Sequence, residues 1–427
     1  MCFGEILKLM IFHGKSIANT EKKVYNIKCM NVSAAEHAVF MEIYGRKMKS
    51  VLKRFGSYLK HVDKILPLIC IAITVFDIYL INSMVDTGII NAATARTQRV
   101  AAILGITVGF IISFIDYKFI SKWWFTYAPF ALILQLLLFV PSLTIQIDDD
   151  MAWLKLGSFT LQPSEITKFV FIITMATHIS KLGEKINSPL QLLLLGVHGL
   201  LPVGLIMYQG DAGSALVFLF IFICMLFMGG LSWKYLVAGL AGVPIVGYLA
   251  WEFIMQDHHR KRFLILFDKE MQQEELLGDY LQQYQGTIAL GSGQLTGLGF
   301  DSNKFTYTPF IENDFVFSYI GMTMGFIGCM AVVIALAVLC LKLLSNASGA
   351  PDQLGRLMCV GVFAMVFFHC VINIGMVLSV VPVIGIPLPF ISQGGTSMMM
   401  THICMGLVVS VSCHKEKVKH MFYTEKD

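Results

Sequence analysis

Long apolar segments dominate the chain and follow one another from Ile65 to Cys413. A bilayer core of about 30 Å is crossed by roughly 20 apolar residues in an α-helix, and lipid offers the backbone no hydrogen-bond partners. Ten such segments can be drawn: Ile65–Met84, Arg99–Ile115, Trp123–Leu143, Ile166–Ile179, Pro189–Met207, Ala212–Gly230, Tyr235–Met255, Phe315–Leu344, Leu357–Val377 and Ser397–Cys413. The sequence predicts an all-α integral membrane protein, a bundle of about ten transmembrane helices with a long extracellular loop between spans seven and eight.

The composition is typical of a polytopic membrane protein. Hydrophobic residues make up 56% of the chain and charged residues only 14%, whereas a soluble domain is about a quarter charged. The net charge of +4 is small and dispersed, which argues against a nucleic-acid partner. Most of the ten cysteines lie inside apolar runs without a Cys-x-x-Cys pair, so we expect neither a disulfide framework nor a zinc site.

The charged residues divide the chain into a membrane domain and two tails. Residues 1–64 form a basic tail, residues 65–413 the membrane domain, and residues 414–427 a polar tail. Lys and Arg gather in the loops that share a side with both tails, so the positive-inside rule predicts cytoplasmic termini. The long outer loop, residues 256–314, carries Lys and Arg on the outer side. The positive-inside rule allows this, because it applies to short loops. The basic stretch Gly45–Lys64 is compatible with two interpretations, a segment that binds the anionic inner leaflet and a solvated tail.

With this orientation, the informative polar stretches lie together on the outer side, as expected for an external polar cavity. Asp314, in the stretch FIENDFVF, precedes the eighth apolar segment, where an acid also suits a helix N-terminus. Glu165 and Lys168 open the fourth segment with the i, i+3 spacing of an ion pair. Asp211 precedes the sixth segment and is expected to cap its helix. Asp77 lies inside the first segment and is expected to pair within the bundle.

Four stretches carry a resemblance to a known family. They are TLQPSEITK (Thr160–Lys168), YQGDAGSALV (Tyr208–Val217), DFVFSYIGMTMGFIG (Asp314–Gly328) and NIGMVLSVVPVIGIPLPFISQGGTS (Asn373–Ser397). The order of prolines and glycines in the last stretch is too particular to arise by chance. Together the stretches resemble the SEDS family of shape, elongation, division and sporulation proteins, which includes RodA and FtsW. The resemblance runs from about the first apolar segment to the C-terminus.

The resemblance implies an enzyme of the bacterial cytoplasmic membrane. SEDS proteins are peptidoglycan glycosyltransferases that polymerise lipid II, an undecaprenyl-pyrophosphate-linked disaccharide pentapeptide, at the outer membrane face. They act with a class B penicillin-binding protein in cell-wall synthesis for shape, division or sporulation. By this resemblance, Asp314 is the catalytic carboxylate. The substrate-binding positions of the family match Glu165, Lys168, Arg260, Arg262, Asp211 and Trp153.

These residue types suit glycosyl transfer. The Asp314 carboxylate can accept the proton of a sugar hydroxyl, and burial at an apolar interface raises the pKa of a carboxyl toward that task. A pyrophosphate leaving group needs Arg or Lys donors or a metal ion. Lys168, Arg260 and Arg262 are the candidate donors, and the sequence leaves open whether a divalent cation assists them. The two arginines would equally suit lipid phosphates, and Trp153 would equally suit the membrane interface.

The chain departs from the family pattern near the candidate site, which predicts a divergent member. Ala152 stands where the family has Arg, Glu312 where it has His, Asn313 where it has Thr, and Gln393 where it has Tyr. Two alternatives to a polymerase therefore stay open. One is a translocase for lipid-linked precursors, and the other is a catalytically impaired scaffold for a class B penicillin-binding protein. The retained Asp314 favours the enzyme.

Overall fold

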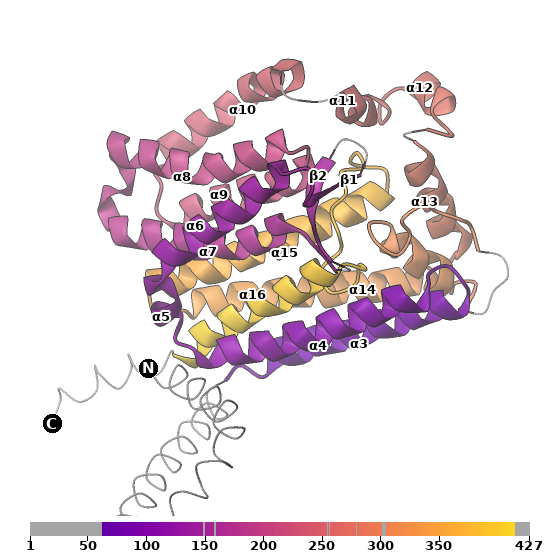
Figure 1. The fold of residues 1–427 in the computed structure, drawn as a ribbon, viewed down its shortest axis with the longest axis horizontal. Helices are drawn as coiled ribbons and strands as arrows, with labels where there is room; N and C mark the ends of the chain where they lie inside the picture. Colours follow the sequence, from indigo (N-terminus) through magenta and orange to yellow (C-terminus); the bar gives the residue numbers. More distant parts are fainter. Residues whose placement is uncertain are drawn as a thin grey trace, which may run out of the picture. The chain divides into compact units, whose positions relative to one another are not determined.

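Each of the ten predicted apolar segments overlaps an α-helix in the structure, a computed structural model of the chain (Figure 1). The structure describes residues 62–147, 150–157, 159–253, 255, 257–278, 280–300 and 305–414. The matching helices are α3 (Ile65–Asp86), α4 (Ala92–Phe114), α6 (Trp124–Leu136), α7 (Pro163–Leu182), α8 (Pro189–Tyr208), α9 (Ala212–Met228), α10 (Trp233–Phe253), α14 (Val316–Ser348), α15 (Gln353–Val377) and α16 (Gly395–Cys413). Within the described residues, six of these (α3, α4, α8, α14, α15 and α16) are long and apolar enough to cross a membrane. The chain is a multi-pass membrane protein, and the count of ten spans stays a prediction.

The predicted tails lie almost wholly outside the described residues. The structure describes only residues 62–64 of the first tail and His414 of the second. The shorter helices of the described chain are α5 (Tyr117–Lys122), η1 (Leu137–Phe139), η2 (Gly183–Asn187), α11 (Asp257–Leu264), α12 (Lys269–Glu274) and α13 (Leu281–Ser292). Of these, α11, α12 and α13 lie in the predicted long loop, residues 256–314, and α13 packs against α14 and α15. Part of the predicted loop therefore belongs to the helical bundle.

A small antiparallel sheet follows η1, which the all-α prediction did not include. Its strands, in the order β1-β2-β3, are β1 (Thr144–Ile147), β2 (Asp150–Leu156) and β3 (Phe159–Leu161). Alternate residues of β2, Ala152 and Leu154, are buried, which is the period of a half-buried strand. The Met151 N–H donates to the Gln209 carbonyl oxygen at 2.8 Å. The sheet is thereby tied to the turn before α9, although strands this short carry little periodic signal in a sequence.

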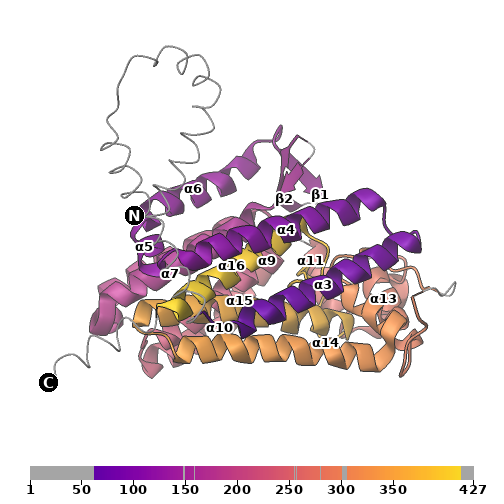
Figure 2. The ribbon, with the colours of Figure 1, turned by 90° about the horizontal axis from the view of Figure 1, so that it is seen from below.

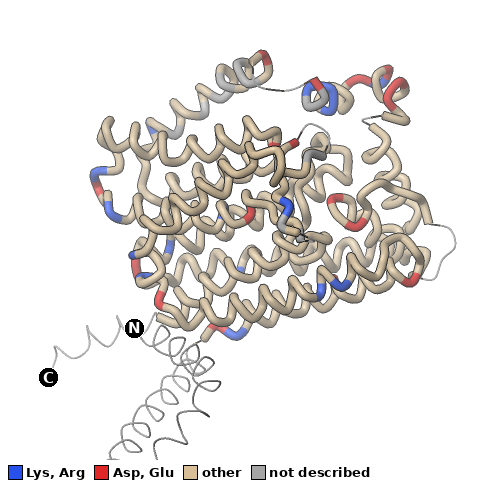
Figure 3. Tube along the Cα trace, in the orientation of Figure 1, with Lys and Arg blue, Asp and Glu red and all other residues tan. Residues whose placement is uncertain are grey.

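Of the six helices that are long and apolar enough to cross a membrane, α15 and α16 are the most buried. Helix α15 packs against α7, α9, α13, α14 and α16 (Figures 1 and 2). Helix α8, by contrast, has mostly exposed apolar side chains, which suits contact with lipid. Figure 3 shows that Lys, Arg, Asp and Glu gather mainly at the helix ends and in the connections. This separation is what a bilayer core requires, because a charge buried there is costly.

Glycines allow α4 and α16 to approach backbone to backbone. A Cβ atom at Gly109 would stand 2.5 Å from the His402 carbonyl oxygen, and one at Gly105 would stand 2.8 Å from Met399 Cα. On the facing helix, a Cβ atom at Gly406 would meet the Gly109 carbonyl oxygen. Small residues at such positions are the usual means of close helix packing in membranes. The contact fixes α16, and with it the chain segment that precedes α16.

We predict that Gly109→Ala destabilises the protein by roughly 1–3 kcal/mol, because the added methyl group overpacks the α4–α16 contact. Gly196→Ala in α8 is the matched control, since a Cβ atom at Gly196 meets nothing within 4 Å. The control should leave the thermal unfolding midpoint of the purified protein unchanged or raise it. Equal midpoints for the two variants would contradict the close contact.

Candidate functional site

Asp314 lies in the turn that leads into α14, and its main chain is held by the helix and loop that follow. The Asn373 side-chain Nδ2 on α15 donates to the Asp314 carbonyl oxygen at 2.8 Å. Ser392 Oγ donates to the carbonyl oxygen of the preceding residue, Asn313, at 2.6 Å. A Cβ atom at Gly385 would stand 3.7 Å from Asp314 Oδ2. The segment 378–394 between α15 and α16, which we call the proline loop, therefore sets the place of the carboxyl group.

The surroundings of Asp314 raise the pKa of its carboxyl group. Burial is the largest cause, and the negative charge of Glu312 adds to it. The positive charge of Arg262 lowers this pKa, and the negative charge of Asp211 raises it. The outcome is a pKa of about 6, compared with an ordinary value of 3.8. A carboxyl group with such a pKa can exchange a proton near neutral pH.

Asp211 caps α9 and joins it to the start of α7. Asp211 Oδ1 accepts from the Ser214 N–H at 2.9 Å, as expected for an N-cap residue. Its other carboxyl oxygen, Oδ2, accepts from Gln162 Nε2 at 3.3 Å and from Ser164 Oγ at 3.4 Å. The predicted capping role is confirmed. The same carboxylate gathers two side chains of the TLQPSEITK stretch, so the two motifs meet in space although they are far apart in the sequence.

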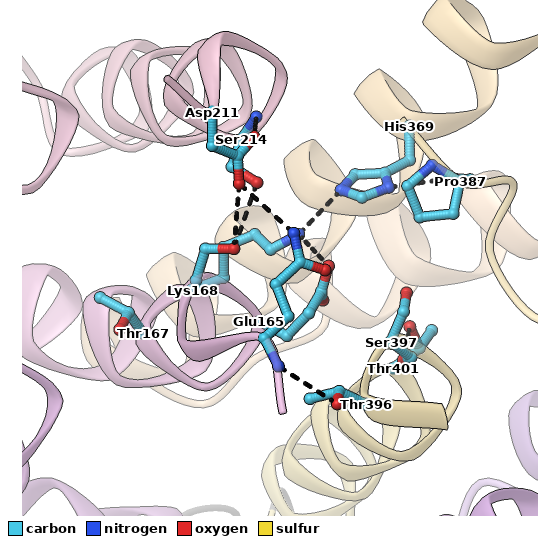
Figure 4. Close-up of polar contacts among 12 residues, drawn as sticks. Glu165, Thr167, Lys168, Asp211, Ser214, His369, Pro387, Thr396, Ser397 and Thr401 are labelled. Atoms are coloured by element: carbon cyan, nitrogen blue, oxygen red, sulfur yellow. Dashed lines mark hydrogen bonds and ion pairs between the residues drawn. The ribbon is translucent and has the colours of Figure 1, made fainter. Parts of the chain in front are cut away.

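Glu165 and Lys168 form a buried ion pair on α7 (Figure 4). Lys168 Nζ lies 2.8 Å from Glu165 Oε1, and the two side chains are 1% and 4% exposed. Lys168 Nζ also lies 3.2 Å from Nε2 of His369 on α15. Since His369 Nδ1 lies 3.1 Å from the Pro387 carbonyl oxygen, which can only accept, Nδ1 carries the proton and Nε2 accepts from Lys168. The ammonium group is thus linked to the proline loop.

The two arginines of α11 are placed differently. Arg260 Nη2 donates to the Glu252 carbonyl oxygen at 3.0 Å, and Arg260 Nη1 lies 3.6 Å from Asp257 Oδ1. Arg262 is the arginine whose charge acts on Asp314. Trp153 lies on β2, opposite Ile145 of β1. The charges of Arg262 and Asp211 therefore act on Asp314, whereas Arg260 contacts Glu252 and Asp257 of its own part of the chain.

Three residues that the sequence did not single out belong to this region. His369 binds Lys168, Asn373 holds the Asp314 main chain, and Thr396 Oγ1 accepts from the Gln162 N–H at 3.4 Å. Asn373 and Thr396 lie in the motif NIGMVLSVVPVIGIPLPFISQGGTS, whose particular order was the available signal. His369 lies before that motif in an apolar helix and has no such signal.

Comparison with known proteins places the chain in a family. The family model described as "Cell cycle protein", which represents FtsW, RodA and SpoVE, matches residues 60–417. The chain belongs to this family. The match covers the whole predicted membrane domain, and the expected resemblance to SEDS proteins is thereby confirmed.

Relatives of the FtsW/RodA/SpoVE family match this chain over most of their length. The protein named probable peptidoglycan glycosyltransferase FtsW of Trichlorobacter lovleyi is 28% identical over 83% of this chain and 94% of its own. The peptidoglycan glycosyltransferase MrdB of Escherichia coli K12 is 28% identical over 83% of this chain and 95% of its own. Stage V sporulation protein E of Bacillus subtilis is 29% identical over 74% of this chain and 86% of its own.

Solved structures agree with this family membership. One solved structure is described as "Structural coordination of polymerization and crosslinking by a peptidoglycan synthase complex". A chain of that structure superposes on this chain with a TM-score of 0.71 at 26% sequence identity. That match covers 83% of this chain and 98% of the other. The rod shape determining protein RodA of Thermus thermophilus gives a TM-score of 0.62 at 25% identity, covering 82% of this chain and 96% of RodA.

We predict that breaking the buried ion pair on one side costs more stability than removing both charges. Lys168→Met leaves the Glu165 carboxylate buried without its partner, at a cost of about 3–5 kcal/mol. The double variant Glu165→Gln/Lys168→Met removes both charges and should recover much of that loss. Thermal unfolding of the purified single and double variants measures the difference. A double variant less stable than Lys168→Met would contradict the prediction.

Proposed function

We propose that the protein polymerises lipid II into peptidoglycan glycan strands at the outer face of the bacterial cytoplasmic membrane. Its family membership and the glycosyltransferase names of its relatives support this proposal. One structural observation carries it for this chain: the main chain of Asp314 is held by Asn373 before α14, and burial raises the pKa of its carboxyl group to about 6. Both termini then lie in the cytoplasm, as the distribution of Lys and Arg predicts.

The proposed reaction assigns a role to each of these groups. The Asp314 carboxylate accepts the proton of the acceptor sugar hydroxyl as that oxygen attacks the anomeric carbon of the donor. The bond from that carbon to the undecaprenyl pyrophosphate breaks, and the pyrophosphate leaves with the electron pair. Arg262 is our candidate for binding the leaving pyrophosphate, with Arg260 two residues before it on α11. Glu165, Lys168 and Asp211 hold the starts of α7 and α9 beside this site.

A penicillin-binding protein of class B is the proposed partner. One of the matching structures is described as structural coordination of polymerization and crosslinking by a peptidoglycan synthase complex. A polymerase that makes glycan strands supplies the substrate for a crosslinking enzyme, so the two activities suit one assembly. For this chain, the partner and the interface stay proposals.

Polymerisation by the purified protein tests the proposed function directly. Asp314→Asn keeps the shape of the side chain and removes the base, so we expect glycan-strand formation from lipid II to fall by roughly 100-fold or more. Asp268→Asn is the matched control, because Asp268 caps α12 in the same long segment and Asn caps nearly as well. The assay should be run with and without a candidate partner.

Each alternative function has its own outcome in this assay. Movement of lipid II across the bilayer without polymer would favour a translocase over the proposed enzyme. Partner binding without either activity would favour a scaffold. Full polymerisation by Asp314→Asn would overturn the role of Asp314.

We predict that the rate of polymerisation falls on acidification, with an apparent pKa near 6. The ionised carboxylate is the active form, and the pKa of Asp314 is raised to about 6. Glu312→Gln removes a negative charge that raises this pKa, so the acid limb should move to lower pH. Arg262→Gln removes a positive charge that lowers it, so the limb should move to higher pH. Rate profiles from pH 5 to pH 8 measure both shifts, and shifts of the same sign would contradict the assignment.

A further inference from the structure

A buried carboxyl group inside the first membrane helix has no role in the site described above. Asp77 lies within α3 and is 0% exposed. Its Oδ2 accepts from Gln98 Nε2 on α4 at 2.9 Å, whereas its Oδ1 makes no hydrogen bond within the described part of the chain. An acid in such surroundings is costly, and an apolar side chain would pack α3 against α4 with less cost. The sequence-based expectation that Asp77 pairs within the bundle is met through an amide, Gln98.

The amide of Gln98 joins this carboxyl group to the proline loop. Besides Asp77, Gln98 Nε2 donates to the Ser392 carbonyl oxygen at 3.1 Å. The Gly394 N–H donates to Gln98 Oε1 at 3.0 Å. The Asp77 carboxylate and the Ser392 carbonyl oxygen accept, while the Gly394 N–H donates, so only one orientation of the amide satisfies all three. Asp77 and the proline loop together hold the Gln98 side chain, which is 0% exposed, in that orientation.

The part of the proline loop held by Gln98 is the part that holds the approach to Asp314. Ser392 Oγ donates to the Asn313 carbonyl oxygen at 2.6 Å and accepts from the Leu388 N–H at 2.7 Å. The next residue, Gln393, donates its N–H to the Glu312 carbonyl oxygen at 2.8 Å. A continuous series of hydrogen bonds therefore runs from Asp77 through Gln98 and Ser392–Gln393 to the two residues before Asp314.

We propose that Asp77 is a positioning residue for Asp314, acting through Gln98 and the proline loop. This inference rests on the proposed function, because it assigns Asp77 to the same reaction. Asp77 touches neither substrate nor reacting atoms. It fixes the Gln98 amide, which fixes Ser392 and Gly394, which fix the main chain that carries the Asp314 carboxyl group. A reacting group displaced by about 1 Å can lose on the order of 100-fold in rate.

Three single variants separate positioning from a general effect on folding. Asp77→Leu removes the acceptor for Gln98 Nε2 and should lower kcat for polymerisation by roughly 10- to 100-fold, with KM for lipid II changed less than about twofold. Asp77→Asn keeps an oxygen acceptor at nearly the same place and should restore kcat to within about threefold of the native value. Thr74→Val is the matched control, because Thr74 Oγ1 lies 2.9 Å from His402 Nε2 in a second buried contact of α3.

The control removes one buried hydrogen bond of α3 without touching the Gln98 series, so it should leave kcat unchanged whatever its effect on the unfolding midpoint. A kcat loss of equal size in Thr74→Val and Asp77→Leu would overturn the inference, since both would then act through the packing of α3. Failure of Asp77→Asn to restore kcat would also overturn it.

A double-variant cycle tests the route through Gln98. If Asp77 acts through that amide, Asp77→Leu added to Gln98→Leu should lower kcat by less than about twofold more, because Asp77 has no other route to the proline loop once the amide is removed. Fully multiplicative losses would contradict the route. A failure of the proposed function gives a different result. If the native protein does not polymerise lipid II, the proposed function itself is wrong. If the native protein is active and Asp77→Leu keeps full kcat, only the positioning role of Asp77 is wrong.

Discussion

The hydrogen bonds of the Asn373 side chain are the interaction on which the site depends. This amide is 0% exposed, and its Nδ2 donates to the carbonyl oxygens of both Asp314 and Ile386 at 2.8 Å. A loop buried against helices needs partners for its main-chain groups, because an unpaired buried polar group is costly. The proline loop finds them on α15 and on the turn before α14, so one buried side chain, Asn373, holds the loop and the turn that carries Asp314 together. Pro387 and Pro389 keep this segment from continuing as helix.

The charges of the site are arranged in two sets with different consequences. Glu165 and Lys168 neutralise each other inside the bundle, and the neutral ring of His369 accepts the remaining contact of the ammonium group. Such a pair is costly to break on one side, and the contact of Lys168 with His369 joins α7 to α15. Around Asp314 the charges do not cancel, because Glu312 opposes what Arg262 contributes. The Glu165–Lys168 pair stabilises the packing of the helices, whereas the charges around Asp314 determine the proton affinity of its carboxyl group.

The sequence predicts well where the membrane helices lie and which residues stand at helix N-termini. It predicts poorly the contacts between residues that are far apart in the chain. Apolar runs of membrane length fix where α3 or α14 lies, since lipid leaves the backbone few choices. The ion pair of Glu165 with Lys168 and the cap at Asp211 are local, so spacing alone suggests them. The contact of Lys168 with His369 joins residues 201 positions apart, and Gln98 meets Ser392 across 294 positions. Contacts of that kind depend on how the helices pack, which no local pattern encodes.

The family departures near Asp314 fall on side chains, whereas its position depends on main-chain atoms. Asn313 and Glu312 are both held through their carbonyl oxygens, by Ser392 Oγ and by the Gln393 N–H. Any residue at positions 312, 313 or 393 presents the same main-chain partner, proline at 393 excepted. If the family pattern predicted from the sequence has His at this position, Glu312 changes the charge beside Asp314, while the hydrogen bond of its main chain is the same for either residue. The predicted divergence of this chain therefore concerns the proton affinity of the Asp314 carboxyl group, whose pKa is raised, and leaves the main-chain contacts around it in place.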